Sequence, residues 1–280
     1  MNDTTTTATT TATPPAQGTG FAAAAHPVAA QTLIHTGTDG LDAGRTELTI
    51  AGQAVPVYHA RPAGRDKLPV VIVVAEIFGL HEHIADVVRR FAREGYFALA
   101  FDPFVRQGDP STIPDIPTLM AQIVRKAPDA QVLGDIDACV DWAGRNGGDV
   151  DRLGITGFCW GGRITWLYAA HNPQVKAGVA WYGRLVGDAN AGQPRHPVDV
   201  APTLTVPVLG LYGAQDSGIP LDTVERMTAA LGQGTSDSTI VVYPDAGHAF
   251  HADYRPSYNA KDARDGFART LAWFREHGVV

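Results

Sequence analysis

The chain has 280 residues, 45% of them hydrophobic, and it carries a formal net charge of −7 at pH 7. This length provides a core for one large domain or two small ones. The negative charge, with no Lys/Arg cluster and no apolar run of membrane-spanning length, excludes a typical nucleic-acid partner and a transmembrane helix.

The first 45 residues differ in composition from the rest. Residues 1–20 are a low-complexity Thr/Ala stretch with a Pro pair. Such a segment has little to bury, which predicts a disordered or weakly ordered N-terminal arm over residues 1–45 that is dispensable for activity. Residues 20–31 faintly resemble the end of a secretory signal, but no basic segment precedes them, and His26 and Pro27 interrupt the apolar part. An arm is therefore favoured over an export signal.

From residue 46 onward, strand-like and helix-like segments alternate. Residues 46–63 read as a hairpin around Gly52, and the apolar, β-branched run 68–76 predicts a strand buried on both faces. Further strands are expected at 96–102, 152–158, 177–183, 206–216 and 238–248, and helices at 83–95, 129–148, 161–171, 221–234 and 262–278. This alternation predicts one α/β domain over residues 46–280, with a mostly parallel sheet covered by helices on both faces.

One of the only two cysteines occupies a turn between a predicted strand and a predicted helix. Cys159 lies between Gly157 and Gly161 in GITGFCWGGRITW, residues 154–166. This is the nucleophile-elbow pattern G-x-S-x-G with Cys in place of Ser. The positive N-terminal end of the following helix stabilises a thiolate. A small core residue is the alternative reading; we accept it for Cys139, on the apolar stripe of a helix, but not for Cys159. A reactive free thiol favours a reducing, cytoplasmic location.

Two further residues complete a nucleophile, acid and histidine in the chain order of α/β-hydrolases. Asp216 and His248 each follow a predicted strand, so both reach the same carboxyl edge of the sheet as Cys159. Taken singly, Asp216 could cap a turn and His248 could be a surface residue. Backbone N–H groups of Trp160, after the nucleophile, and of Ile77, in the loop after strand 68–76, are the expected oxyanion hole.

The sequence resembles the dienelactone hydrolases (carboxymethylenebutenolidases) of the α/β-hydrolase superfamily from about residue 45 to the end. The resemblance is carried by EIFGLHEHI, FDPFVRQ, GFCWGGR, LYGAQD and PDAGHAFHADYRPSYN. It implies a Cys159–His248–Asp216 triad. It also implies that Glu76, otherwise a solvated charge at a strand end, contacts the resting cysteine and helps to activate it.

The resemblance also implies an anionic substrate bound by arginines. Arg106 matches one such position, but the second position, four residues after the histidine, is Ala252 here. Arg255 either compensates for this or is a surface charge. Tyr182 either lines the pocket or packs in the core. The HEHI sequence at residues 81–84 is not a zinc motif and reads better as a helix start.

These observations predict a single-domain α/β-hydrolase that cleaves a lactone or ester through a thioester acyl-enzyme. We expect a small-molecule substrate, no cofactor or metal, and a monomer or small homo-oligomer. Three alternatives remain open: a carboxylesterase for another small ester, a catalytically silent hydrolase fold used for binding, and a redox-sensing thiol protein. The last lacks a resolving partner, because Cys139 reads as buried.

Overall fold

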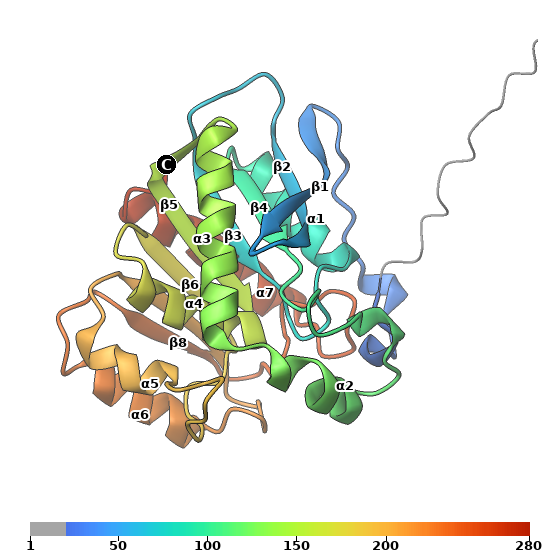
Figure 1. The fold of residues 1–280 in the computed structure, drawn as a ribbon. Coiled ribbons are helices and arrows are strands. Elements are labelled where there is room, and N and C mark those ends of the chain that lie inside the picture. The colour runs from blue at the N-terminus through green and yellow to red at the C-terminus, as the bar shows by residue number, and fades with distance from the viewer. Residues whose placement is uncertain (1–20) are drawn as a thin grey trace, which may run out of the picture.

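A single twisted sheet organises the computed structural model, which describes residues 21–280. Its eight strands follow the order β1-β2-β4-β3-β5-β6-β7-β8 (Figure 1). Strands β3 to β8 are parallel, whereas β2 pairs antiparallel with both β1 and β4. The bounds are β1 (Leu41–Ile50), β2 (Gln53–Pro62), β3 (Leu68–Val74), β4 (Phe97–Phe101), β5 (Gly148–Phe158), β6 (Ala177–Trp181), β7 (Val208–Gly213) and β8 (Thr239–Tyr243).

Helices cover both faces of this sheet. Helices α3 and α4 pack on one face, and α1 and α7 pack on the other, where Phe91 of α1 meets Phe267 of α7 (Figure 1). The helices are α1 (Glu82–Arg93), α2 (Ile116–Gln122), α3 (Asp129–Arg145), α4 (Trp160–His171), α5 (Pro197–Val200), α6 (Leu221–Leu231) and α7 (Ala260–Glu276). Short 3-10 turns are η1 (Ala23–Ala25), η2 (Ala30–Thr32), η3 (Pro110–Thr112), η4 (Val124–Lys126) and η5 (Ala201–Thr203).

The central strand explains why an apolar β-branched run was a reliable signal. Every residue of β3 is buried, because the strand is flanked by β4 and β5 and covered by helices on both faces. Its carboxyl end delivers Glu76 and Ile77 to the edge of the sheet where β5 ends at Phe158. The predicted α/β-hydrolase fold, with a mostly parallel sheet covered on both faces, is confirmed.

The N-terminal region differs from the expectation of a weakly ordered arm over residues 1–45. Residues 1–20 lie outside the described residues, but residues 21–45 pack on the domain, and β1 begins at Leu41 rather than near residue 46. Thr36 N–H donates to Asp86 Oδ1 at 2.6 Å, and Ala25 is fully buried. The alanine-rich composition was misleading because small side chains let the backbone approach the domain closely and bond to it.

The longest described helices, α3 and α7, have 17 residues each. A helix needs about 20 apolar residues to cross a bilayer. Within residues 21–280, none of the helices has the length and apolarity that a membrane crossing requires.

Candidate active site

Cys159 occupies a strained turn between β5 and α4. Its backbone has φ +54° and ψ −114°, outside the regions that most L-residues adopt. A Cβ at Gly157 would lie 2.2 Å from the Gly161 oxygen, and a Cβ at Gly161 would lie 2.3 Å from the Val74 oxygen. Only glycine fits at these two positions, so the sequence pattern reflects close backbone contact. The Cys159 N–H donates to the Trp181 carbonyl at 3.0 Å, which ties the turn to β6.

The structure brings Cys159, His248 and Asp216 into one hydrogen-bonded chain. Cys159 Sγ lies 3.1 Å from His248 Nε2, and His248 Nδ1 lies 2.7 Å from Asp216 Oδ2. Asp216 is buried, and its other oxygen accepts the N–H groups of Gly218 and Ile219 at 2.9 and 3.2 Å. These backbone bonds fix the carboxylate, which in turn orients the imidazole toward the sulfur.

The electrostatics favour a charged pair between sulfur and imidazole. Burial acts to lower the pKa of His248, but the negative charge of Cys159 and the hydrogen bond to Asp216 outweigh it and raise this pKa to about 10. The thiol and the imidazole share one proton and titrate as a unit. At neutral pH that proton resides on His248, and the sulfur is a thiolate, the reactive form.

These residues open into a cavity of about 360 Å³, the lower part of the range for small-molecule sites. Most of its lining is apolar. Among the residues predicted from the sequence, the cavity is lined by Cys159, His248, Glu76, Ile77, Trp160, Tyr182 and Arg255. The Ile77 N–H donates to no other group among the described residues, and Trp160 is the first residue of α4, where N–H groups lack intrahelical partners. Both amides are thus available to an oxyanion.

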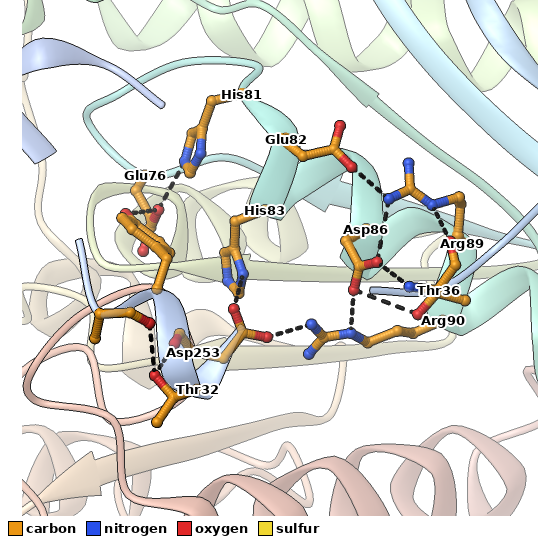
Figure 2. Close-up of polar contacts among 12 residues, drawn as sticks. Thr32, Thr36, Glu76, His81, Glu82, His83, Asp86, Arg89, Arg90 and Asp253 are labelled. Carbon is orange, nitrogen blue, oxygen red and sulfur yellow. Dashed lines mark hydrogen bonds and ion pairs between the residues drawn. The ribbon is translucent and has the colours of Figure 1, made fainter. Parts of the chain in front are cut away.

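Glu76 lies in the cavity wall, but its carboxylate is engaged elsewhere than at the thiol. Oε2 accepts hydrogen bonds from His81 Nε2 at 3.0 Å (Figure 2) and from the Tyr254 hydroxyl at 2.8 Å. Burial would raise the pKa of Glu76, yet these bonds outweigh it and hold the pKa below its usual value. The hydrogen bonds described for residues 21–280 pair Cys159 Sγ with His248, not with Glu76. The contact implied by the family resemblance is therefore absent from this arrangement.

Arg106 lies outside the cavity, contrary to the expectation that it binds substrate. Its guanidinium forms a two-pronged ion pair with Asp135 of α3, at 2.7 and 2.9 Å, and also donates to the Ile50 carbonyl. Asp135 is buried, so its charge needs a partner. The sequence could not reveal this pairing, because it joins the loop after β4 to a helix about thirty residues later.

Arg255 and Tyr182 do line the cavity. Arg255 stacks over the Phe78 ring at 5.6 Å, and the Tyr182 ring lies 5.3 Å from that of His248. Ala252, at the place of the missing arginine, is fully buried.

Sequence reasoning missed four residues of the site. Arg125, Arg184 and Tyr254 line the cavity, and His81 bonds to Glu76. Arg184 follows β6 directly, so its position after a strand at the carboxyl edge was an available signal. Tyr254 and His81 stand in motifs already singled out, but only their contacts give them a role. In the part of the chain that the structure describes, no group of three or more His, Cys, Asp or Glu residues is arranged to hold a metal ion.

The family model of the dienelactone hydrolase family matches residues 55–278. The chain belongs to the dienelactone hydrolase family. It is 57% identical over 263 residues to a candidate carboxymethylenebutenolidase of Escherichia coli K12, covering 94% of this chain and 97% of the relative. A candidate 2-oxo-3-(5-oxofuran-2-ylidene)propanoate lactonase of Bradyrhizobium is 33% identical over 230 residues, covering 81% of this chain and 91% of the relative.

Solved structures agree with this family assignment. A candidate dienelactone hydrolase from Klebsiella pneumoniae has a TM-score of 0.83 and 59% identity, covering 84% of this chain and 99% of its own. The dienelactone hydrolase-like phosphotriesterase P91, from metagenomic libraries, shares the fold with a TM-score of 0.70 and 22% identity, covering 85% of this chain and 99% of its own. This member of the family is a carboxylic ester hydrolase with the α/β-hydrolase fold.

Proposed function

We propose that the chain hydrolyses a small lactone or ester through a Cys159–His248–Asp216 triad and a thioester intermediate. The observation that carries the proposal is the 3.1 Å contact between Cys159 Sγ and His248 Nε2 at a strained turn that opens into the cavity. A thiolate needs a proton carrier within hydrogen-bond reach to complete acyl transfer, and His248 meets that requirement.

In the first half of the reaction, the Cys159 thiolate attacks the substrate carbonyl carbon, and the carbonyl electron pair moves to oxygen. The N–H groups of Ile77 and Trp160 stabilise this oxyanion. When the tetrahedral intermediate collapses, the C–O bond of the ester breaks, and His248 gives its proton to the departing oxygen. The acyl group remains on sulfur as a thioester.

In the second half, neutral His248 takes a proton from a water molecule, which attacks the thioester carbonyl. Collapse of the second tetrahedral intermediate releases the carboxylic acid and restores the thiolate beside a protonated His248. Asp216 keeps the imidazole oriented and stabilises its positive charge throughout.

The charges at the cavity favour a substrate that carries a carboxylate. Arg125 and Arg184 line the cavity with exposed side chains and form no ion pair within residues 21–280, whereas Arg163 is already paired with Asp129 at 2.7 Å. The name of the Bradyrhizobium relative specifies a propanoate, which is an anionic lactone substrate. We infer that Arg125, Arg184 and Arg255 take the recognition role that was expected of Arg106.

A neutral ester is the second candidate substrate, because apolar side chains form much of the cavity wall. Phe78, Ile116, Met120, Val124 and Ile219 all line it. Their side chains suit the acyl or alcohol part of an uncharged ester as well as the ring of a lactone.

The test is turnover of lactones and aryl esters in matched pairs with and without a carboxylate. The wild-type enzyme should show a burst of product with an activated ester, and Cys159→Ala should remove nearly all activity without unfolding the protein. Cys159→Ser should lose orders of magnitude in rate, because a hydroxyl is a far weaker acid than a thiol. Wild-type turnover by Cys159→Ala would refute the mechanism. Arg184→Ala should raise KM for the anionic member of each pair only; equal effects on both members would favour the neutral ester.

A further inference from the structure

The N-terminal segment, residues 21–32, binds the polypeptide that follows His248. The Ala29 N–H donates to the Tyr254 carbonyl at 2.7 Å, and the Phe21 ring stacks on the Tyr254 ring with centroids 5.0 Å apart at 19°. Arg255 Nη1 donates to the Ala25 carbonyl at 3.1 Å. Side chain and backbone of Tyr254 are therefore both fixed by a segment more than two hundred residues earlier.

The same segment holds two neighbouring parts of the structure. The Thr32 hydroxyl donates to the Asp253 carbonyl, as Figure 2 shows. On its other side η1 packs against η3 and α2, and the blue η1 and green α2 lie side by side in Figure 1. Helix α2 supplies Ile116 and Met120 to the cavity wall. The segment thus connects two walls of the active-site cavity.

Tyr254 transmits this placement to Glu76. Its hydroxyl donates to Glu76 Oε2 at 2.8 Å, on the same oxygen that His81 contacts at 3.0 Å. The Phe21 ring also lies 5.9 Å from the His81 ring, so it contacts both donors of the carboxylate. Glu76 is the one acidic side chain that lines the cavity within the described residues. Its position decides where negative charge lies relative to the thiolate and to a bound anion.

We infer that residues 21–32 are a positioning element of the active site: by fixing Tyr254, they hold the Glu76 carboxylate on Tyr254 and His81 and not on the Cys159 thiol. The inference rests on the proposed role of Cys159 as nucleophile. A carboxylate released from this position would approach the sulfur, where like charges repel and the thiolate is disfavoured. Pairing of the sulfur with His248 would then be weakened.

The prediction for pH follows from the groups that surround the sulfur. These are His248 after β8, with Asp216 behind it, Glu76 after β3, Tyr182 after β6, Arg163 on α4, and Tyr254 and Arg255 in the loop before α7. Removing the Phe21 ring changes none of these charges directly; it changes the freedom of Tyr254 and hence of Glu76. The alkylation of Cys159 should consequently require a higher pH to reach half of its maximal rate.

The experiment measures the rate of Cys159 alkylation by iodoacetamide as a function of pH in four full-length variants. Phe21→Ala and Tyr254→Phe should each slow alkylation at pH 7 by about five- to ten-fold and move its pH midpoint upward. The double variant should be no slower than the slower single variant, because both changes act through one hydroxyl. Leu33→Ala, an exposed side chain just beyond the segment, should match the wild type.

A wild-type alkylation profile in Phe21→Ala, or effects that multiply in the double variant, would overturn the inference. Thermal unfolding is measured in parallel, and Phe21→Leu, which keeps apolar volume without the stacked ring, replaces Phe21→Ala if the latter fails to fold. The wild type separates this inference from the proposed function. If Cys159 is not the labelled residue there, the proposed function fails; if it is labelled and Phe21→Ala has no effect, only the positioning role fails.

Discussion

Replacement of Gly161 by alanine tests whether the close contacts behind the nucleophile determine its reactivity. The new Cβ would stand 2.3 Å from the Val74 oxygen and 2.6 Å from the Ala75 oxygen. The shorter distance falls about 1 Å inside van der Waals contact, and both atoms belong to backbone at the end of β3, which cannot rotate away. Either the Cys159 turn or the β3 end, which leads into Glu76 and Ile77, must move.

A displacement of about 1 Å at a reacting group costs on the order of 100-fold in rate. We therefore expect Gly161→Ala to lower kcat/KM on an activated ester by about that factor, while overpacking costs about 1–3 kcal/mol of stability. Steady-state turnover measures the first effect, and chemical denaturation measures the second.

Gly134→Ala is the matched control. Gly134 lies within α3, and a Cβ there meets nothing within 4 Å. Since alanine favours the helix over glycine, this variant should gain about 1 kcal/mol of stability and keep wild-type activity. The reasoning would be refuted if Gly161→Ala folded stably and retained wild-type kcat/KM.

Three other outcomes follow from the contacts. Arg106→Ala should cost about 3 kcal/mol in chemical denaturation, because it strands the buried Asp135 carboxylate, and should not discriminate anionic from neutral esters; a KM increase confined to anionic esters would contradict this. His248 has a folded-state pKa raised to about 10, so its contribution to stability is complete below about pH 6.5 and is lost as the pH rises through 10. The unfolding midpoint of the wild type should fall over that interval more than that of Cys159→Ala, and equal falls would refute the coupling. Cys139→Ser should keep wild-type turnover and iodoacetamide labelling, because burial raises the pKa of the Cys139 thiol far above its usual value; loss of labelling would place the reactive thiol at Cys139.

The sequence by itself determined the features that depend on local order along the chain. Continuous β-branched runs such as 68–76 can only be buried strands, and a cysteine between glycines at a strand-to-helix turn is a local geometry that few other structures require. Because parallel strands place their carboxyl ends on one edge, strand order also predicted that Asp216 and His248 would approach Cys159.

Only the tertiary structure decided which charges meet and which chain segments close the cavity. Arg106 matches a substrate-binding position in its motif, yet Asp135 of α3 captures it, since a buried carboxylate needs a counter-charge. Residues 21–32 look unstructured by composition, yet they bond to Tyr254 and through it act on Glu76. Such contacts join residues far apart in sequence, and their free energy comes from desolvation and fit at the meeting surfaces, which composition and periodicity do not record.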